Sequence, residues 1–194
     1  MERICVYCGS NPGRDPAYRE AATAFGRELV ARDLGLVYGG GTVGMMGTLA
    51  DAVLEAGGEA HGVIPESLLE REPPHRGLTE LDVVQSMHER KARMVELADG
   101  FVALPGGYGT FEELLEVLTW AQLGFHRSPC GVLNVAGYYD DLVAFLDHAV
   151  AEEFVSQDHR EMVVVAEDPG PLLDGFERYE PPAVKRYVRD PGET

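Results

Sequence analysis

The chain has little positive charge and almost no lysine. Its 194 residues include 16 Lys and Arg against 33 Asp and Glu, which gives a net charge of -17. This balance argues against partners such as nucleic acid or anionic membranes, because neutralising phosphate supplies most of the affinity for them. The lysines are Lys91 and Lys185, so any chemistry through a lysine Schiff base has Lys91 as its plausible candidate. Positive charge suited to a small anion is concentrated locally at Arg90-Lys91.

Cysteines and long apolar runs are also scarce. Cys5, Cys8 and Cys130 are too few for a disulfide framework and favour a cytoplasmic protein. Cys5 and Cys8 form a C-x-x-C in a strand pattern, where residues three apart point to opposite faces, so buried structural thiols are favoured over a redox or zinc site. No run approaches the roughly 18 apolar residues of a membrane span. Nothing at the start resembles a signal peptide, and the histidines show no metal-ligand spacing, so we expect neither a membrane nor a metal.

Strand-like and helix-like segments alternate along the chain. We expect strands over 4–8, 34–38, 60–64, 81–84, 101–104, 131–135 and 162–165, and helices over 16–30, 45–55, 86–97, about 110–123 and 139–152. Continuous apolar strands in β-α alternation predict an α/β, mostly parallel sheet with helices on both faces. We expect one nucleotide-binding domain over 1–176, an extended or docking tail over 177–194, and a mobile active-site loop over the proline-rich residues 65–77. Ligands of such sheets bind at the carboxyl ends of the strands.

The most informative segment runs from Leu104 to Glu116, Leu-Pro-Gly-Gly-Tyr-Gly-Thr-Phe-Glu-Glu-Leu-Leu-Glu. Glycines between a strand and a helix let backbone N–H groups approach an anion, and the helix N-terminus adds about half a positive charge. Thr110-x-x-Glu113 also fits a capping box, in which Glu113 would serve only the helix. The alternative is an acid beside a bound phosphate. Glu113 and Glu116 share a helix face, so each must be solvated, paired with a cation or shifted in pKa.

A second glycine run, Gly39 to Gly44, satisfies G-x-G-x-x-G between a strand and a helix. Dinucleotide binding also needs an acid at the tip of the next strand, and Glu59 stands at the wrong end of that strand. A generic phosphate or sugar loop is therefore favoured over an NAD site. Tight packing of the β-α turn is the structural alternative.

Met87-His-Glu-Arg-Lys91 supplies the counter-charge. Ser86-x-x-Glu89 predicts a capping box at the start of this helix. Arg90 falls on an apolar face with Met87 and Met94, where an arginine extends its charge to solvent, pairs with an acid or clamps a phosphate.

These segments resemble the signatures of the LOG ("Lonely Guy") family: Val37-Tyr-Gly-Gly-Gly-Thr-Val-Gly-Met-Met-Gly47, Met87 to Lys91, and Pro105 to Glu113. The match runs from Cys8 to Gly124, about two thirds of the chain. Members of that family are cytokinin riboside 5′-monophosphate phosphoribohydrolases, often labelled "possible lysine decarboxylase".

The resemblance implies a Rossmann-like, doubly wound α/β fold and a homodimer. The dimer would hydrolyse the N-glycosidic bond of a purine nucleoside 5′-monophosphate, AMP or an N6-modified AMP, without a cofactor. The resemblance also implies a catalytic pair of Arg90 and Glu113. The predicted substrate and phosphate contacts are Ser10, Gly40, Gly41, Glu72, Met87, Lys91, Gly106, Gly107, Tyr108, Gly109, Thr110, Glu116 and Thr119. Pro73-Pro-His-Arg76 departs from the pattern expected of plant members and leaves the preferred base open.

Hydrolysis of the C1′–N9 bond builds positive charge on the ribose, which a carboxylate stabilises while it orients water. Glu113 is the expected carboxylate, and Arg90 is expected to keep it ionised and to position the nucleotide. The alternative is a nucleotide sensor or carrier without turnover. Lysine decarboxylation is disfavoured, because its single candidate Lys91 adjoins an apparent anion clamp.

Overall fold

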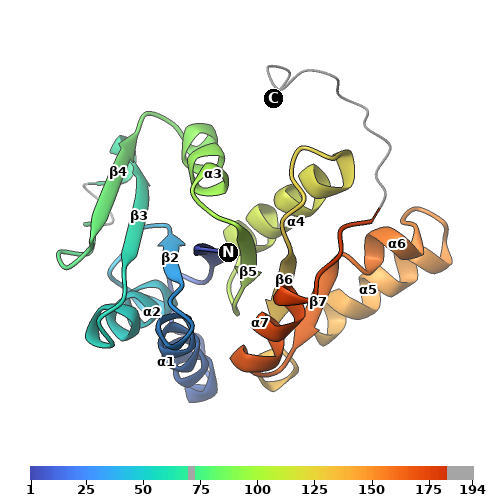
Figure 1. Cartoon of the computed structure of the whole chain (residues 1–194), viewed down its shortest axis with the longest axis horizontal. Helices are drawn as coiled ribbons and strands as arrows, with labels where there is room; N and C mark the ends of the chain where they lie inside the picture. The colour runs from blue at the N-terminus through green and yellow to red at the C-terminus, as the bar shows by residue number, and fades with distance from the viewer. Residues whose placement is uncertain (70–72, 183–194) are drawn as a thin grey trace.

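Seven parallel strands form one sheet in the order β4-β3-β2-β1-β5-β6-β7 (Figure 1). The computed structural model describes residues 1–69 and 73–182. The strands are β1 (Arg3–Tyr7), β2 (Gly35–Tyr38), β3 (Ala60–Pro65), β4 (Glu80–Val84), β5 (Gly100–Ala103), β6 (Cys130–Leu133) and β7 (Val163–Ala166). Every neighbouring pair is parallel, which confirms the predicted fold class.

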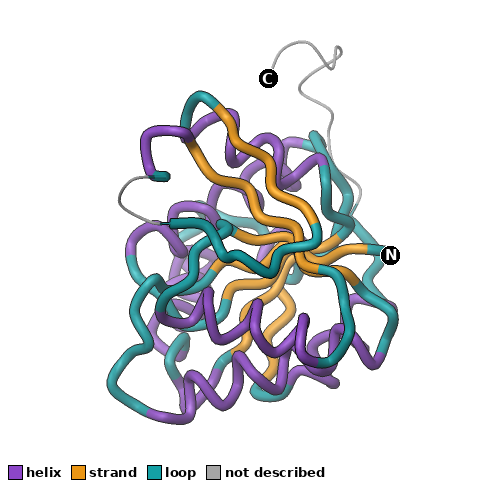
Figure 2. Tube along the Cα trace, turned by 90° about the vertical axis from the view of Figure 1, so that its left-hand side faces the viewer, coloured by secondary structure: helices purple, strands orange, loops and turns teal. Residues whose placement is uncertain are grey.

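Helices cover both faces of this sheet (Figure 2). The α-helices are α1 (Pro16–Ala31), α2 (Gly44–Glu55), α3 (Met87–Glu96), α4 (Tyr108–Leu123), α5 (Asp140–Ala151), α6 (Gln157–Arg160) and α7 (Pro169–Glu177), with short 3-10 turns η1 (Glu66–Leu68) and η2 (Val135–Gly137). One core joins α1, α2 and α7 to side chains such as Ile4, Leu36 and Val102. On the opposite face α3, α4 and α5 pack against Cys5, Phe101 and Val132.

The direction of winding reverses between β1 and β5. From β1 the chain steps outward through β2 and β3 to β4, and then returns to place β5 on the other side of β1. A ligand crevice is expected where the order of parallel strands reverses in this way. The loops that follow β1 and β5 therefore face the place where the sequence predicts a phosphate.

The start of each long helix follows its local sequence. Asp15 caps α1 by accepting a hydrogen bond from the Ala17 N–H at 2.9 Å, and Pro16 occupies the first turn. Ser86 caps α3 through the Glu89 N–H at 3.2 Å, and the Glu89 carboxylate accepts from the Gln85 N–H at 2.7 Å. The predicted capping box of α3 thus forms with its return bond shifted by one residue.

Most predicted bounds differ from the observed ones by one or two residues. The helices α6 and α7 were not predicted. The three cysteines are free and buried, with Cys5 and Cys8 in cores on opposite faces, which confirms the interpretation as structural thiols. No helix in residues 1–69 and 73–182 is long and apolar enough to cross a membrane. Of the predicted tail, residues 183–194 lie outside the described residues.

Candidate functional site

Three loops meet at the carboxyl ends of β1, β2 and β5. The Gly9 N–H donates to the Pro105 carbonyl at 3.1 Å, and the Met45 N–H donates to the Gly9 carbonyl at 3.1 Å. Gly44 has a φ of +64°, and a Cβ on it would lie 2.2 Å from the Ser10 carbonyl oxygen. Only glycine fits there. The loops therefore form one connected backbone platform at the switch point.

The helix α4 starts within the glycine-rich segment. Its N-cap is Gly107, which provides no side-chain hydrogen bond, and its first residue is Tyr108. The capping-box interpretation of Thr110 and Glu113 is therefore wrong, because Thr110 already lies inside the first turn and is 4% exposed. The backbone amides at this N-terminus have no side-chain cap, and the Glu113 carboxylate is not used as one.

A cavity of about 290 Å³ opens beside this helix start. Its wall includes Arg90 and Met87 from α3, Glu113 and the first turn of α4, and Ser10 from the loop after β1. We call it the carboxylate cavity. It combines a cation, an acid and an uncapped helix N-terminus, the groups needed to hold an anion and to move a proton.

Arg90 is buried, at 9% exposure, and its charge is poorly satisfied. Its Nε has no hydrogen-bond partner among the described residues, and Nη1 has only the Met87 sulfur at 3.9 Å. A Cβ on Gly39 would lie 2.0 Å from Nη2 of Arg90, so the absence of a side chain at Gly39 makes room for the guanidinium. A buried cation with open donors is suited to an anionic ligand.

Glu113 is the acid of the carboxylate cavity whose pKa is shifted by its surroundings. Burial raises its pKa to about 7, and the charge of Arg90 only partly opposes the effect. Within residues 1–69 and 73–182 no cation forms an ion pair with it. Arg90 acts in the expected direction, because its charge favours the ionised carboxylate, but the loss of hydration outweighs this attraction. A carboxyl with a pKa near 7 can accept or donate a proton at neutral pH.

Lys91 forms ion pairs with two neighbouring acids of α4. Its Nζ lies 2.5 Å from the Glu112 carboxylate and 2.9 Å from the Glu116 carboxylate. Burial opposes its charge, but the hydrogen bonds that Lys91 donates to Glu112 and Glu116 outweigh burial and raise the pKa of Lys91. Of the two acids on one face of α4, Glu116 is therefore paired, whereas Glu113 is shifted in pKa.

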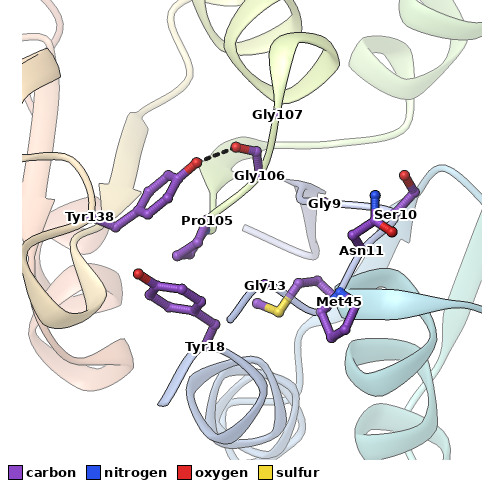
Figure 3. A pocket seen from close by; sticks show the side chains of 11 residues that line it. Gly9, Ser10, Asn11, Gly13, Tyr18, Met45, Pro105, Gly106, Gly107 and Tyr138 are labelled. Atoms are coloured by element: carbon purple, nitrogen blue, oxygen red, sulfur yellow. Dashed lines mark hydrogen bonds between the residues drawn. The ribbon is translucent and has the colours of Figure 1, made fainter. Parts of the chain in front are cut away.

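A second cavity of about 280 Å³ is lined by Pro105, Gly106 and Gly107 of the loop between β5 and α4 (Figure 3). We call it the tyrosine cavity, after Tyr18 and Tyr138 on its wall. Gly9, Ser10 and Gly107 line both cavities. The Tyr138 hydroxyl donates a hydrogen bond to the Gly106 carbonyl (Figure 3).

The structure gathers most, not all, of the predicted site residues. Those lining the carboxylate cavity are Ser10, Met87, Arg90, Gly107, Tyr108, Gly109, Thr110 and Glu113, and Gly106 lines the tyrosine cavity. Gly40 and Gly41 instead bind the segment around Pro74, through the His75 N–H and an antiparallel bridge. Thr119 lines a separate groove with Leu115 and Met162. Glu72 lies outside the described residues.

Several neighbours of the site were missed by sequence reasoning. Leu68 and Met46 line the carboxylate cavity, Tyr138 holds the Gly106 carbonyl, and Gly39 accommodates Arg90. Gly39 belongs to the glycine run that follows β2, but its contact is with Arg90, which is distant in the sequence. Tyr138 carried no local signal, because its partner lies 32 residues away. Among the described residues no group of three His, Cys, Asp or Glu side chains is arranged to hold a metal ion.

Comparison with solved structures identifies the same fold in distant proteins. The molybdenum cofactor binding protein from Rippkaea orientalis superposes with a TM-score of 0.69 at 20% identity, over 91% of this chain and 96% of that one. The molybdenum cofactor carrier protein from Chlamydomonas reinhardtii gives a TM-score of 0.68 at 19% identity, over 92% and 97% of the two chains. At these identities the likeness shows the fold alone.

Sequence comparison finds much nearer relatives. A family model described as "Possible lysine decarboxylase" matches residues 46–176. A cytokinin riboside 5′-monophosphate phosphoribohydrolase, LOG7 of Arabidopsis thaliana, is 53% identical over 93% of this chain and 83% of its own length. A second cytokinin riboside 5′-monophosphate phosphoribohydrolase, LOG of Oryza sativa subsp. japonica, is 51% identical over 93% of this chain and 75% of its own length. The chain belongs to this family, described as possible lysine decarboxylases and including the LOG phosphoribohydrolases.

Proposed function

We propose that this protein hydrolyses the N-glycosidic bond of a purine nucleoside 5′-monophosphate of the cytokinin type, releasing the free base and ribose 5-phosphate. The names of its relatives support this reaction. The observation that carries the proposal is the position of Glu113, an acid with a pKa of about 7 in one cavity with Arg90 and the N-terminus of α4.

The 5′-phosphate binds at the start of α4. The N–H groups at a helix N-terminus and the helix dipole attract such a group. A Cβ on Gly107 or Gly109 would meet no atom within 4 Å, so packing inside the chain does not explain these glycines. Their open space is where the phosphate approaches the backbone, and the unpartnered donors of Arg90 add charge from α3.

Glu113 then acts on the ribose. As the C1′–N9 bond breaks, its electron pair leaves with the base and positive charge develops at C1′. The ionised carboxylate stabilises this charge and accepts a proton from the attacking water, whose oxygen bonds to C1′. That proton passes to the departing base nitrogen, which restores the carboxylate. The balance requires one substrate and one water.

Lysine decarboxylation does not fit the site. A Schiff base needs a neutral amine, whereas Lys91 is held as an ammonium between Glu112 and Glu116. Lys185 lies outside the described residues.

The test is release of free base from AMP and from isopentenyladenosine monophosphate, followed by chromatography. Glu113→Gln should lose turnover by at least about a hundredfold yet still bind AMP, because it removes the proton acceptor and keeps the shape of the side chain. A matched control is Glu152→Gln, which removes a charge at the exposed end of α5. Unchanged turnover in Glu113→Gln refutes the role of Glu113. A nucleotide-dependent melting shift without product in the wild type indicates a sensor or carrier instead, and cadaverine from lysine contradicts both.

The proposal includes a cytoplasmic homodimer. Thr119, a predicted ligand contact, lies in a groove separate from the carboxylate cavity of its own chain. A contact between Thr119 and the nucleotide would therefore come from a second copy. Comparing the two substrates above also determines the preferred base.

A further inference from the structure

Tyr138 reaches from η2, which follows β6, to the loop between β5 and α4. Its hydroxyl donates to the Gly106 carbonyl (Figure 3). Its ring is held edge-on by Tyr18 at 5.5 Å and by Tyr139 at 5.0 Å between centroids. The hydroxyl therefore sits at a fixed point beside the glycine-rich loop.

This bond fixes the orientation of one peptide group. The C=O of Gly106 and the N–H of Gly107 belong to the same peptide, and the described chain contains no cis peptide bond. In a trans peptide these two groups point in opposite directions. Because the Gly106 carbonyl points toward Tyr138, the Gly107 N–H points away from it. Within the described ranges this N–H has no hydrogen-bond partner, and Gly107 lines the carboxylate cavity.

A pair of glycines cannot hold such an orientation unaided. A glycine–glycine peptide lacks the Cβ atoms that restrict rotation, so it can turn over at little cost. Two residues before Gly106, the Leu104 carbonyl accepts a hydrogen bond from the Tyr139 hydroxyl at 2.7 Å. The Tyr139 N–H in turn donates to the Asn134 side chain at 2.7 Å, which fixes both tyrosines relative to β6. The loop is thus anchored to the segment that follows β6.

We propose that Tyr138 is a positioning residue of the phosphate site: its hydroxyl directs the Gly107 N–H toward the 5′-phosphate monoester. This inference rests on the function proposed above. It assigns a role in phosphate affinity to a residue in a different loop and a different cavity from the reacting groups.

The test compares Tyr138→Phe with Tyr18→Phe. Tyr138→Phe removes only the hydroxyl, so the Gly106–Gly107 peptide is free to turn. We expect the KM for AMP and the inhibition constant of ribose 5-phosphate to rise together by about 3- to 10-fold, the effect of one hydrogen bond. The kcat should stay within about twofold, and inhibition by free adenine should not change, because adenine carries no phosphate. Tyr18→Phe removes a hydroxyl from the same cavity that bonds to no other described residue, and it should behave as wild type.

Each result bears on the inference. A KM for AMP within twofold of wild type, a fall in kcat alone, or equal weakening of adenine and ribose 5-phosphate overturns it. A Tyr138→Phe protein that does not fold also overturns it, since the residue then serves the fold rather than the phosphate. If wild-type protein releases no base from AMP, the proposed function itself fails, and this outcome is distinct from an active enzyme indifferent to Tyr138→Phe.

Discussion

Burial of Glu113 should make the protein less stable at neutral and alkaline pH than it would be without that acid. The proposed chemistry needs a proton acceptor near pKa 7, and the fold obtains it by removing the carboxyl from water. Ionising a buried carboxyl is unfavourable, so Glu113→Gln should raise stability while it removes activity.

The size of this effect follows from the pKa. Burial raises the pKa from 4.5 to about 7. Each unit corresponds to about 1.4 kcal/mol, so the full difference is about 3 kcal/mol. A raised folded-state pKa contributes stability that is fully present below pH 4.5 and is lost as pH rises through 7. The gain from Glu113→Gln should therefore be near zero at pH 4 and about 3 kcal/mol at pH 8, or about 6–12 °C in Tm for a chain of this length.

Thermal unfolding followed by circular dichroism between pH 4 and pH 8 measures this difference. Glu152→Gln serves as the control, since it removes an exposed charge and should show no pH-dependent gain. If Glu113→Gln is no more stable than wild type at pH 8, or if its gain is the same at every pH, burial does not set the pKa of Glu113.

Two further results are expected from the same site. The kcat/KM for AMP should rise with pH through about 7 and fall about tenfold per unit well below it, as measured by initial rates, because the ionised form of Glu113 accepts the proton; a flat profile from pH 5 to 8 contradicts this role. Gly107→Ala should keep the wild-type Tm, because its Cβ meets no atom within 4 Å, yet raise the KM for AMP at least about tenfold by occupying the phosphate position. In the companion variant Gly106→Ala the new Cβ would lie 2.1 Å from Oγ1 of Thr110, so this variant should have a lower Tm than wild type. Equal Tm values for Gly107→Ala and Gly106→Ala contradict this prediction.

The central strands of the sheet could be predicted from the sequence because they are short, almost wholly apolar runs. Residues of β1, β3 and β5 are almost all buried, so short apolar runs mark them without ambiguity. The helix α7 was missed although Asp168-Pro169 repeats the signal of Asp15-Pro16. Gly170 and Pro171 follow at once and weaken its helical pattern. The helix forms because Leu172, Leu173 and Phe176 are buried against the sheet, a contribution that depends on the fold.

The site residues also differ in whether the local sequence or contacts with distant residues determine their roles. The glycine-rich loop and its acid were recognisable because a strand, glycines and a helix follow one another directly. The role of each glycine could not be predicted, because it depends on the atoms that lie next to it in the fold. These are Arg90 at Gly39 and Ser10 at Gly44, whereas Gly107 faces open space. The capping interpretation failed for a related reason, because the helix began at Tyr108, before the threonine that fitted the motif.

The difference between the acids of α4 arises from two adjacent residues of α3. Successive helical residues point about 100° apart, so Arg90 lines the carboxylate cavity while Lys91 points elsewhere and contacts α4. Lys91 contacts Glu112 and Glu116 and compensates both negative charges. Without it, Glu113 would lie beside two uncompensated carboxylates, and their repulsion would raise its pKa further, beyond the range useful for a base at neutral pH. Arg90 is left with open donors for a substrate anion. Lys91 thus neutralises the acids beside Glu113, whereas Arg90 keeps its charge available for the phosphate. A single cation could not do both.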